Sequence, residues 1–325
     1  MDILVSILCT AYNHEKYIRD ALEGFVNQKT NFKYEVIVHD DCSTDNTAQI
    51  IKEYAEKYPD IIKPIYEEEN QYHKVNSIID DIMIPLAKGK YIALCEGDDY
   101  WIDENKLQMQ TDYLQNNSDC TFCFTDAMVY DCTTERTEEM FKRFHNDNIL
   151  PVKSMDKFTL KEIIPLTFIA TASYMYPKDN YNKYPKEYFY KYPVGDRTIT
   201  LFSVLIGCGH YIDKSTCVYR VNVPSSATTV WRDWSKKQIY DLQNRLMDIY
   251  KNIDALTEGK YKEVIYKATF VNKINILKTG YNRQLLKNKE YKQVFNEATK
   301  TDKLKIIVSN YMPKLYDFLK KIKNK

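Results

Sequence analysis

Short apolar runs that alternate with helical stretches constrain the fold of this chain more than any other feature. Residues 3–9, 34–38 and 91–95 are rich in aliphatic and aromatic side chains, as buried strands are. Residues 17–28 and 43–58 lie between them and carry apolar side chains at helical spacing. Strands joined by helices pair in parallel, because each helix returns the chain to the same edge of the sheet. The sequence therefore predicts an α/β fold with a mostly parallel sheet flanked by helices.

Three carboxylates follow the third apolar run directly. Glu96, Asp98 and Asp99 surround Gly97 where the strand ends, and the carboxyl ends of parallel strands are where α/β folds bind ligands. Oxygen ligands at this spacing suit a hard divalent cation, Mg²⁺ or Mn²⁺, which also takes substrate phosphates. A polar turn is the alternative, since glycine and aspartate are common in turns. The mutual repulsion of three acids favours the metal site.

Polar and aromatic residues also follow the first two runs. Thr10, Tyr12 and Asn13 come after the first run, and Asp40 and Asp41 come after the second. Adjacent strand ends of this kind form one crevice, in which an aromatic ring can stack on a base and a carboxylate can accept a base N–H. For the two aspartates a structural role and a ligand role are both open.

Two later features are weaker signals. Asp196 precedes an apolar helical run, so it is either a helix cap or, if it faces the same crevice, a general base. Arg220 lies at the end of a strand-like run and could bind a diphosphate or pair with an acid at the sheet edge. The residues alone leave these alternatives open.

The charge of the chain divides near residue 226. Residues 226–325 hold 22 Lys and Arg against 10 Asp and Glu, whereas the net charge of the whole chain is only +1. This asymmetry predicts two regions with different roles. We expect residues 1–225 to form the sheet-containing domain and residues 226–325 to form a basic, mainly helical C-terminal region.

The end of the basic region carries an amphipathic pattern. Leu315, Phe318, Leu319 and Ile322 are spaced for one face of a helix, with lysines around them. Three roles fit this pattern: a helix that lies on an anionic membrane, a helix packed on its own domain, or a homodimer contact. Nucleic acid is not an expected partner, because no recognition module accompanies the charge.

Several functional classes are disfavoured by features that the sequence lacks. No apolar run is long enough to span a bilayer, and the first ten residues do not resemble a signal peptide, which favours a cytoplasmic location. The lone pair Cys120 and Cys123 predicts buried, reduced thiols rather than a zinc site. The histidines lack metal-ligand spacing, and neither a Gly-x-Ser-x-Gly motif nor a glycine-rich phosphate loop occurs. Triad hydrolases and P-loop enzymes are therefore not expected.

Three segments together resemble family 2 glycosyltransferases. They are Val-Ser-Ile-Leu-Cys-Thr-Ala-Tyr-Asn at 5–13, Val-Ile-Val-His-Asp-Asp-Cys-Ser-Thr-Asp-Asn-Thr at 36–47 and Lys-Gly-Lys-Tyr-Ile-Ala-Leu-Cys-Glu-Gly-Asp-Asp-Tyr-Trp at 88–101. The resemblance covers the first 130 residues in order and thins to scattered matches up to Ala227. It implies a Rossmann-like GT-A fold and an inverting enzyme that uses a nucleotide-diphosphate sugar.

The resemblance also implies a role for each matching residue. Asp98 would be the direct ligand of a Mn²⁺ or Mg²⁺ ion on the diphosphate, with Glu96 and Asp99 as further metal ligands. Asp196 would be the catalytic base that deprotonates the acceptor hydroxyl. The nucleotide-binding residues would be Thr10, Ala11, Tyr12, Asn13, Asp41, Asp98 and Arg220. The acceptor site would be shaped by Tyr100 and Trp101.

The sequence departs from the family pattern at a few positions. Glu96 replaces the usual first aspartate of the metal motif, and a glutamate can still reach a metal. Cys42 replaces the usual glycine. Asn222 and Pro224 follow Arg220 where the family has a histidine and glycines, so no metal or phosphate role is expected of Asn222.

The predicted function is the transfer of a sugar from a nucleotide-diphosphate sugar, expected to be a UDP-sugar, to a hydroxyl of a glycan or lipid-linked acceptor. Such a reaction belongs to the biosynthesis of a capsule or another surface polysaccharide. A catalytically silent sugar-nucleotide-binding module is the alternative, and a nucleotidyltransferase is less favoured because it normally carries a glycine-rich phosphate loop. The expected location is the cytoplasm, at the inner face of the cell membrane if the basic helices contact it.

Overall fold

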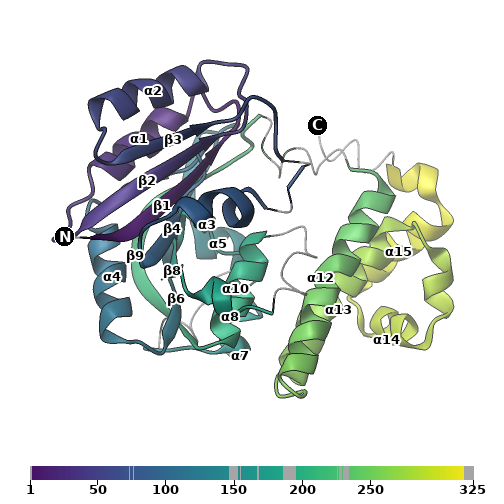
Figure 1. The fold of residues 1–325 in the computed structure, drawn as a ribbon. Coiled ribbons are helices and arrows are strands. Elements are labelled where there is room, and N and C mark those ends of the chain that lie inside the picture. Colours follow the sequence, from purple (N-terminus) through teal and green to yellow (C-terminus); the bar gives the residue numbers. More distant parts are fainter. Residues whose placement is uncertain are drawn as a thin grey trace. The chain divides into compact units, whose positions relative to one another are not determined.

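The computed structural model describes residues 2–72, 74–75, 77–145, 153, 155–166, 168–185, 195–224, 226, 229 and 234–317. These residues divide into two units (Figure 1), of which the first contains the sheet and ends at Thr229. The described part of the second unit consists of the helices from Lys236 onward. The assignment of the two units as separate domains stays a prediction.

Four parallel strands form one half of the sheet in the first unit. They are β1 (Ile3–Ala11), β2 (Lys33–Asp40), β3 (Ile62–Tyr66) and β4 (Tyr91–Leu94), and their order in space is β3-β2-β1-β4. β1 pairs with β2 on one side and with β4 on the other, in parallel in both cases. The predicted α/β fold is confirmed, and the ends of β1, β2 and β4 meet at one edge as expected.

The other half of the sheet is mixed, which the expectation of a mostly parallel sheet did not anticipate. The remaining strands are β5 (Tyr100–Trp101), β6 (Cys120–Asp131), β7 (Arg136–Glu139), β8 (Tyr174–Pro177) and β9 (Cys208–Val221). β8 lies antiparallel between β4 and β6, whereas β6 and β9 run in parallel. β6 extends to Asp131, because β9 pairs with it over its whole length.

Helices flank the sheet where the apolar spacing predicted them. The described helices of the first unit are α1 (Ile18–Val26), α2 (Thr47–Lys57), α3 (Ile84–Leu86), α4 (Lys106–Asn116), α5 (Met140–His145), α7 (Leu160–Ile163), α8 (Asn180–Lys183) and α10 (Gly195–Leu205). The chain before β4 forms a π-helical segment, Ile78–Met83, followed by the short α3. Pro85 lacks the N–H that a regular α-helix would direct to the carbonyl of Asp81, which accounts for the irregularity.

A close approach fixes the start of β4 against β1. A side chain at Gly89 would collide with the backbone of Ser6. The backbone N–H of Gly89 donates to the Ser6 hydroxyl (2.8 Å), which in turn donates to the buried Glu35 carboxylate (2.7 Å). These contacts before β4 therefore fix the register of β4 against β1. They also fix the position of the residues that follow β4.

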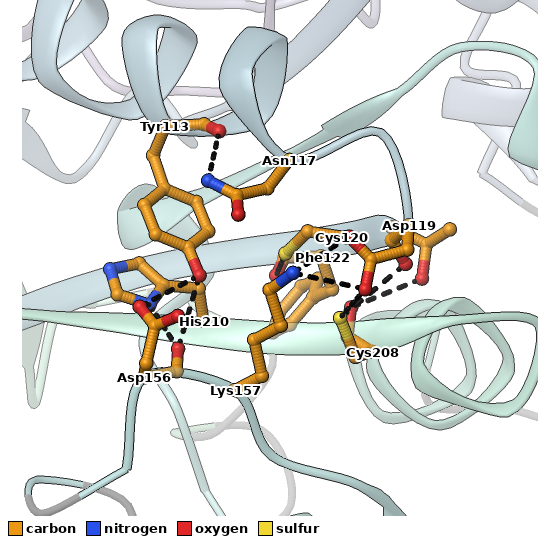
Figure 2. Close-up of polar contacts among 10 residues, drawn as sticks. Tyr113, Asn117, Asp119, Cys120, Phe122, Asp156, Lys157, Cys208 and His210 are labelled. Carbon is orange, nitrogen blue, oxygen red and sulfur yellow. Dashed lines mark hydrogen bonds and ion pairs between the residues drawn. The ribbon is translucent and has the colours of Figure 1, made fainter.

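A polar cluster connects the amino-terminal ends of β6 and β9 to α4. Figure 2 shows Tyr113 of α4 stacked on His210, with ring centroids 3.4 Å apart, and hydrogen-bonded to Asp156 at 3.0 Å. Lys157 pairs with Asp119 at 2.8 Å, beside the Cys208 thiol at the start of β9. Because this cluster lies at the amino ends of β6 and β9, it supports the sheet at the edge away from the acidic turn.

The second unit is helical in its described part, as the sequence predicts. Its elements are α12 (Lys236–Leu256), α13 (Lys262–Thr279), the short η4 (Arg283–Lys287), α14 (Lys289–Glu297) and α15 (Lys300–Tyr311). Their common core is formed by Met247, Ile274, Ile276, Leu277, Tyr291, Val294, Ala298 and Ile306. Phe318, Leu319 and Ile322 of the predicted amphipathic helix lie outside the described residues.

No helix in the described part of the chain combines the length and the apolar character that crossing a bilayer requires.

Candidate active site

The acidic turn continues β4 along the end of β1. The backbone N–H of Gly97 donates to the Thr10 carbonyl (2.9 Å), and the N–H of Asp99 closes the turn on the Glu96 carbonyl (3.0 Å). A side chain at Gly97 would come within 2.9 Å of His14 Nδ1 and 2.8 Å of Ile18 Cδ1. Glycine is therefore needed here because the turn packs tightly against α1 and the loop before it.

The pKa of the Glu96 carboxyl is strongly raised. Burial, the charge of Asp98 and, to a smaller extent, that of Asp196 raise the pKa of Glu96 to about 7. The Thr171 side chain hydrogen-bonds this carboxylate, while its Oε2 atom is buried without a partner among the described residues. An unpaired buried oxygen among like charges is a place where a cation would be stabilised.

Asp98 lies beside a histidine that the sequence did not single out. His14 Nε2 is 4.0 Å from Asp98 Oδ2, and both side chains are only slightly exposed. His14 Nδ1 is buried with no hydrogen-bond partner in the described part. Neither His14 nor Thr171 is marked by motif spacing, because each reaches the turn from a different, sequence-distant loop.

Asp99 and Arg220 connect the acidic turn to β9. Asp99 is 1% exposed, and its Oδ1 atom accepts a 2.8 Å hydrogen bond from the backbone N–H of Arg220. The Arg220 guanidinium donates to the Asp98 carbonyl (2.9 Å), pairs with Asp20 and lies 4.3 Å from the Tyr100 ring centroid. In this structure Asp99 and Arg220 brace the turn, and Arg220 forms its ion pair with Asp20 of α1. The metal role of Asp99 and the diphosphate role of Arg220 stay predictions.

Asp196 lies in the first turn of α10, so the helix already includes this residue. Its Oδ1 atom accepts a 2.6 Å hydrogen bond from the Arg197 backbone N–H, and burial raises the pKa of the Asp196 carboxyl. The buried Arg197 guanidinium donates to the carbonyls of Ile164 (2.6 Å) and Leu166 (2.7 Å) after α7. The start of α10, and hence Asp196, is held firmly by these contacts.

The four predicted acidic residues all influence the pKa of one tyrosine. The charges of Asp99, Glu96, Asp98 and Asp196 all act on the Tyr219 hydroxyl of β9, whose pKa is raised chiefly by burial and further by these carboxylates. Carboxylates from two segments about a hundred positions apart in the sequence therefore contribute to one acidic edge.

The end of β1 borders this edge. Thr10 and Ala11 use their carbonyls to hold Gly97 and Asp41 (both 2.9 Å), so these two residues link the ends of β4 and β2. Tyr12 is 40% exposed, which leaves its ring accessible to a planar ligand.

Asn13 and Asp41 have structural partners. The Asn13 carboxamide accepts from the Thr44 N–H (2.8 Å), and Asn13 itself has a left-handed backbone with φ 56°. The Asp41 carboxylate is 4% exposed and accepts from the N–H groups of Gln71 (2.6 Å) and Tyr72 (3.2 Å). In this structure the Asp41 carboxylate therefore has the structural role, since it holds the backbone of Gln71 and Tyr72. Its ligand role stays a prediction.

Trp101 is a core residue, contrary to the acceptor-site expectation. Its ring is 4% exposed and lies edge-on to Phe25, with centroids 5.0 Å apart. Its indole N–H donates to the Ala172 carbonyl (2.8 Å). Tyr100 next to it is partly exposed but packs on Arg220. An aromatic pair after an acidic turn looks like a surface feature in sequence, whereas the short β5 turns the tryptophan inward.

A buried polar chain supports the turn that carries Thr171. Lys106 is 0% exposed, and its ammonium donates to Gln110 (2.6 Å), which donates to the Ser173 carbonyl (2.9 Å). The same ammonium lies 4.4 Å from the Trp101 ring centroid. Trp101 and Gln110 thus hold the carbonyls of Ala172 and Ser173, the two residues directly after Thr171, whose side chain bonds Glu96.

The buried ammonium predicts a measurable pH dependence of stability. Burial lowers the pKa of Lys106 to about 8, so between pH 8 and the unfolded pKa of about 10.4 the unfolded chain binds more protons, and stability rises with pH. Relative to Lys106→Met, the wild-type free energy of unfolding should rise by about 3 kcal/mol over this range. Urea denaturation of both proteins across pH 7.5 to 10.5 measures it.

The control for this prediction is Lys52→Met, which removes an exposed lysine of α2. Its difference from the wild type should not change with pH. If the difference in the free energy of unfolding between the wild type and Lys106→Met did not change with pH either, a buried ammonium with a lowered pKa would be contradicted.

The acidic edge fits a divalent cation in its donor chemistry. Glu96 and Asp98 supply carboxylate oxygens, one of them unpaired and buried. Among the residues that the structure describes, no three His, Cys, Asp or Glu side chains are arranged to hold an ion by themselves. Magnesium in nucleotide sites is usually held by one or two carboxylates together with substrate phosphates. The residues present therefore fit an ion that binds jointly with a diphosphate.

The parallel strands, the acidic turn after β4 and the third carboxylate on α10 define a protein of the GT-A class. Residues 6–161, just under half of this chain, match the family model described as "Glycosyl transferase family 2", so this part of the chain is similar to that family.

Two relatives illustrate the match and its extent. An uncharacterised protein of Mycobacterium tuberculosis, Rv1520, is 46% identical over 125 residues, which are 38% of this chain and 35% of that protein. The putative teichuronic acid biosynthesis glycosyltransferase TuaG of Bacillus subtilis is 34% identical over 122 residues, 38% of this chain and 46% of TuaG. The matched part spans less than half the length of either relative.

Solved structures share the fold over nearly the whole chain. TarS (1–349) of S. aureus, solved with UDP-GlcNAc, has a TM-score of 0.57 at 17% identity, covering 94% of this chain and 79% of that one. The mannosyltransferase PcManGT of Pyrobaculum calidifontis, solved with GDP-Man and Mn²⁺, has a TM-score of 0.57 at 16% identity, with 95% and 87% covered. This likeness confirms the GT-A fold with a C-terminal helical region.

Proposed function

We propose that this chain transfers a sugar from a nucleotide-diphosphate sugar to an acceptor hydroxyl, with inversion at the anomeric carbon. The observation that carries the proposal is the convergence of Glu96 and Asp98 after β4 with Asp196 on α10, at an edge bordered by the exposed ring of Tyr12. A pair of carboxylates is suited to bind a metal ion on the diphosphate, and a separate carboxylate is suited to act as the proton acceptor.

Asp98 and Glu96 would hold Mn²⁺ or Mg²⁺ together with the diphosphate. The bound ion would neutralise negative charge on the leaving diphosphate. Tight packing of Gly97 against α1 and the contact of Arg220 with the Asp98 carbonyl keep the turn in place for this role. PcManGT, which was solved with GDP-Man and Mn²⁺, supports a divalent ion by analogy of fold.

Asp196 would accept the proton of the acceptor hydroxyl. Its pKa is raised by burial, which makes it a stronger base than an ordinary aspartate. Attack by the acceptor oxygen then occurs on the face opposite the departing diphosphate, so that no covalent enzyme intermediate is needed. The anchored start of α10 fixes where the proton is accepted.

The donor is proposed to be a UDP-sugar. Tyr12 is the accessible ring for stacking on the base, and Thr10 and Ala11 lie at the same strand end. Asp41 would bind the base edge only after releasing the N–H groups of Gln71 and Tyr72. TarS, solved with UDP-GlcNAc, supports this donor class.

The acceptor is proposed to be a glycan or lipid-linked intermediate in the biosynthesis of a surface polysaccharide such as a capsule. The likeness to TuaG, which is named for teichuronic acid biosynthesis, supports this choice. We also propose a cytoplasmic location, contact of the basic helices with the inner face of the membrane, and a homodimer.

Calorimetric titration with UDP, GDP, CDP and dTDP, each with and without Mn²⁺, tests the proposal. We expect one nucleotide, UDP, to bind tightly and only with the metal. The matched control is Glu104→Gln, which removes an exposed carboxylate outside the acidic edge and should bind as the wild type does. Folded protein that binds none of the four nucleotides would refute the proposed donor site.

A further inference from the structure

The solvent face of α15 carries apolar side chains in a continuous stripe. Leu304, Ile307 and Tyr311 are spaced by three and four residues, so they lie on one side of the helix. Ile306 and Asn310 lie on the opposite side, where Asn310 donates to the Leu277 carbonyl at 2.8 Å. The helix is therefore already packed on α13 through its other face, and the stripe is not needed for the core of its own unit.

The stripe continues past the end of α15. Its members are between 43% and 62% exposed. They are Leu304, Ile307, Tyr311, Met312 and Leu315. Contiguous exposed apolar residues of this kind mark a binding surface more often than isolated ones do.

Positive charge surrounds the stripe. Lys300, Lys305 and Lys314 are exposed, and none of them forms an ion pair with a described acidic residue. The two acids of this segment are engaged elsewhere in the unit, Asp302 with Lys278 (2.6 Å) and Asp317 with Lys236 (3.0 Å).

An arginine from outside the helix adds to this charge. The Arg283 guanidinium lies 4.0 Å from the Tyr311 ring centroid. The stripe is thus flanked by cations whose counter-charges are not supplied by the described part of the unit.

We propose that this face of α15, with the turn that follows it, binds an anionic lipid surface. Apolar side chains in the middle of a helix face with lysines along its edges are typical of helices that lie in the headgroup region of a bilayer. Each flanking lysine adds attraction to anionic lipids. The inference goes beyond the transfer reaction, because it requires no residue of the acidic edge.

Charge favours a lipid surface over a second copy of the chain. A two-fold contact would place the same patch against itself, so Lys300, Lys305 and Lys314 would face their own copies. Like charges facing one another across an interface oppose association. A surface of anionic headgroups instead supplies the missing negative charge.

Vesicle sedimentation of the full chain tests the inference. We expect binding to vesicles of phosphatidylcholine with phosphatidylglycerol, little binding to phosphatidylcholine alone, and a decrease in binding as salt is raised.

Leu304→Ser/Ile307→Ser should weaken vesicle binding by at least about tenfold, since it removes apolar side chains that would insert into the bilayer surface. Lys300→Gln/Lys305→Gln should weaken it specifically for the anionic vesicles. The matched control is Val271→Ser, which changes an equally exposed residue of α13.

Three outcomes would overturn the inference. They are no binding of the wild type to anionic vesicles, unchanged binding of the α15 variants, and a wild-type dimer that the Leu304→Ser/Ile307→Ser variant converts to a monomer without any vesicle binding. Nucleotide titration of the same preparations separates this test from the proposed function, because donor binding should be equal in all of them.

Discussion

Replacing Asp98 with asparagine is expected to lower sugar transfer on the order of a thousandfold. The substitution keeps the shape of the side chain but removes the charge that would hold the metal and its diphosphate. Arg220 contacts the Asp98 carbonyl and not its carboxylate, so the turn itself should remain in place. Turnover with the donor identified by titration, measured as kcat/KM, gives the loss, and metal-dependent nucleotide binding should fall with it.

Glu104→Gln is the control for this substitution, because it removes one carboxylate that is paired with Lys29 at the surface. It should retain wild-type turnover. Nucleotide binding by Asp98→Asn that still depends on the metal as strongly as in the wild type would contradict the assigned role.

Asp196→Asn is expected to spare donor binding and to reduce transfer by about a hundredfold to ten-thousandfold. The reason is that Asp196 would accept a proton in the transfer step and has no part in holding the nucleotide. Because burial raises the pKa of Asp196, the base is lost on the acid side at a higher pH than for an ordinary aspartate. The wild-type kcat/KM should therefore rise with pH through the pKa of Asp196, and Asp196→Asn should lack that rise.

Asp179→Asn is the matched control, since Asp179 is an exposed aspartate paired with Lys183. It should change neither the rate nor the pH profile. Near-normal transfer by Asp196→Asn would show that the base is another group. Donor binding by a wild type that transfers no sugar to any tested acceptor would favour the silent binding module.

The sequence was sufficient to predict what depends on local pattern. The alternation of apolar runs and helical spacing predicted β1, β2 and β4 and the edge at which they end. The carboxylates after β4 followed from their position at a strand end. The structure also explains why glycine is usual at position 42, because Cys42 has φ 61°, a left-handed backbone that glycine adopts without strain.

The sequence was not sufficient where a long-range contact decides what a side chain does. Nothing local to Trp101 shows that the Ala172 carbonyl will take its indole N–H. Likewise, the partners of Arg220 come from α1 and from the acidic turn, 200 and 122 residues away. His14 and Thr171 went unnoticed for the same reason, since only the folded chain brings them to the carboxylates.

The crowding of carboxylates at the end of β4 has a thermodynamic consequence for the protein as a whole. Burial and mutual repulsion raise the pKa values of Glu96 and Asp99, so the ligand-free chain folds against an electrostatic strain located at this edge. A ligand that binds only the folded state and relieves that strain shifts the folding equilibrium by mass action. The population of folded chains would then depend on how much donor and metal surrounds them, and nucleotide-sugar supply would influence the lifetime of the protein as well as its rate.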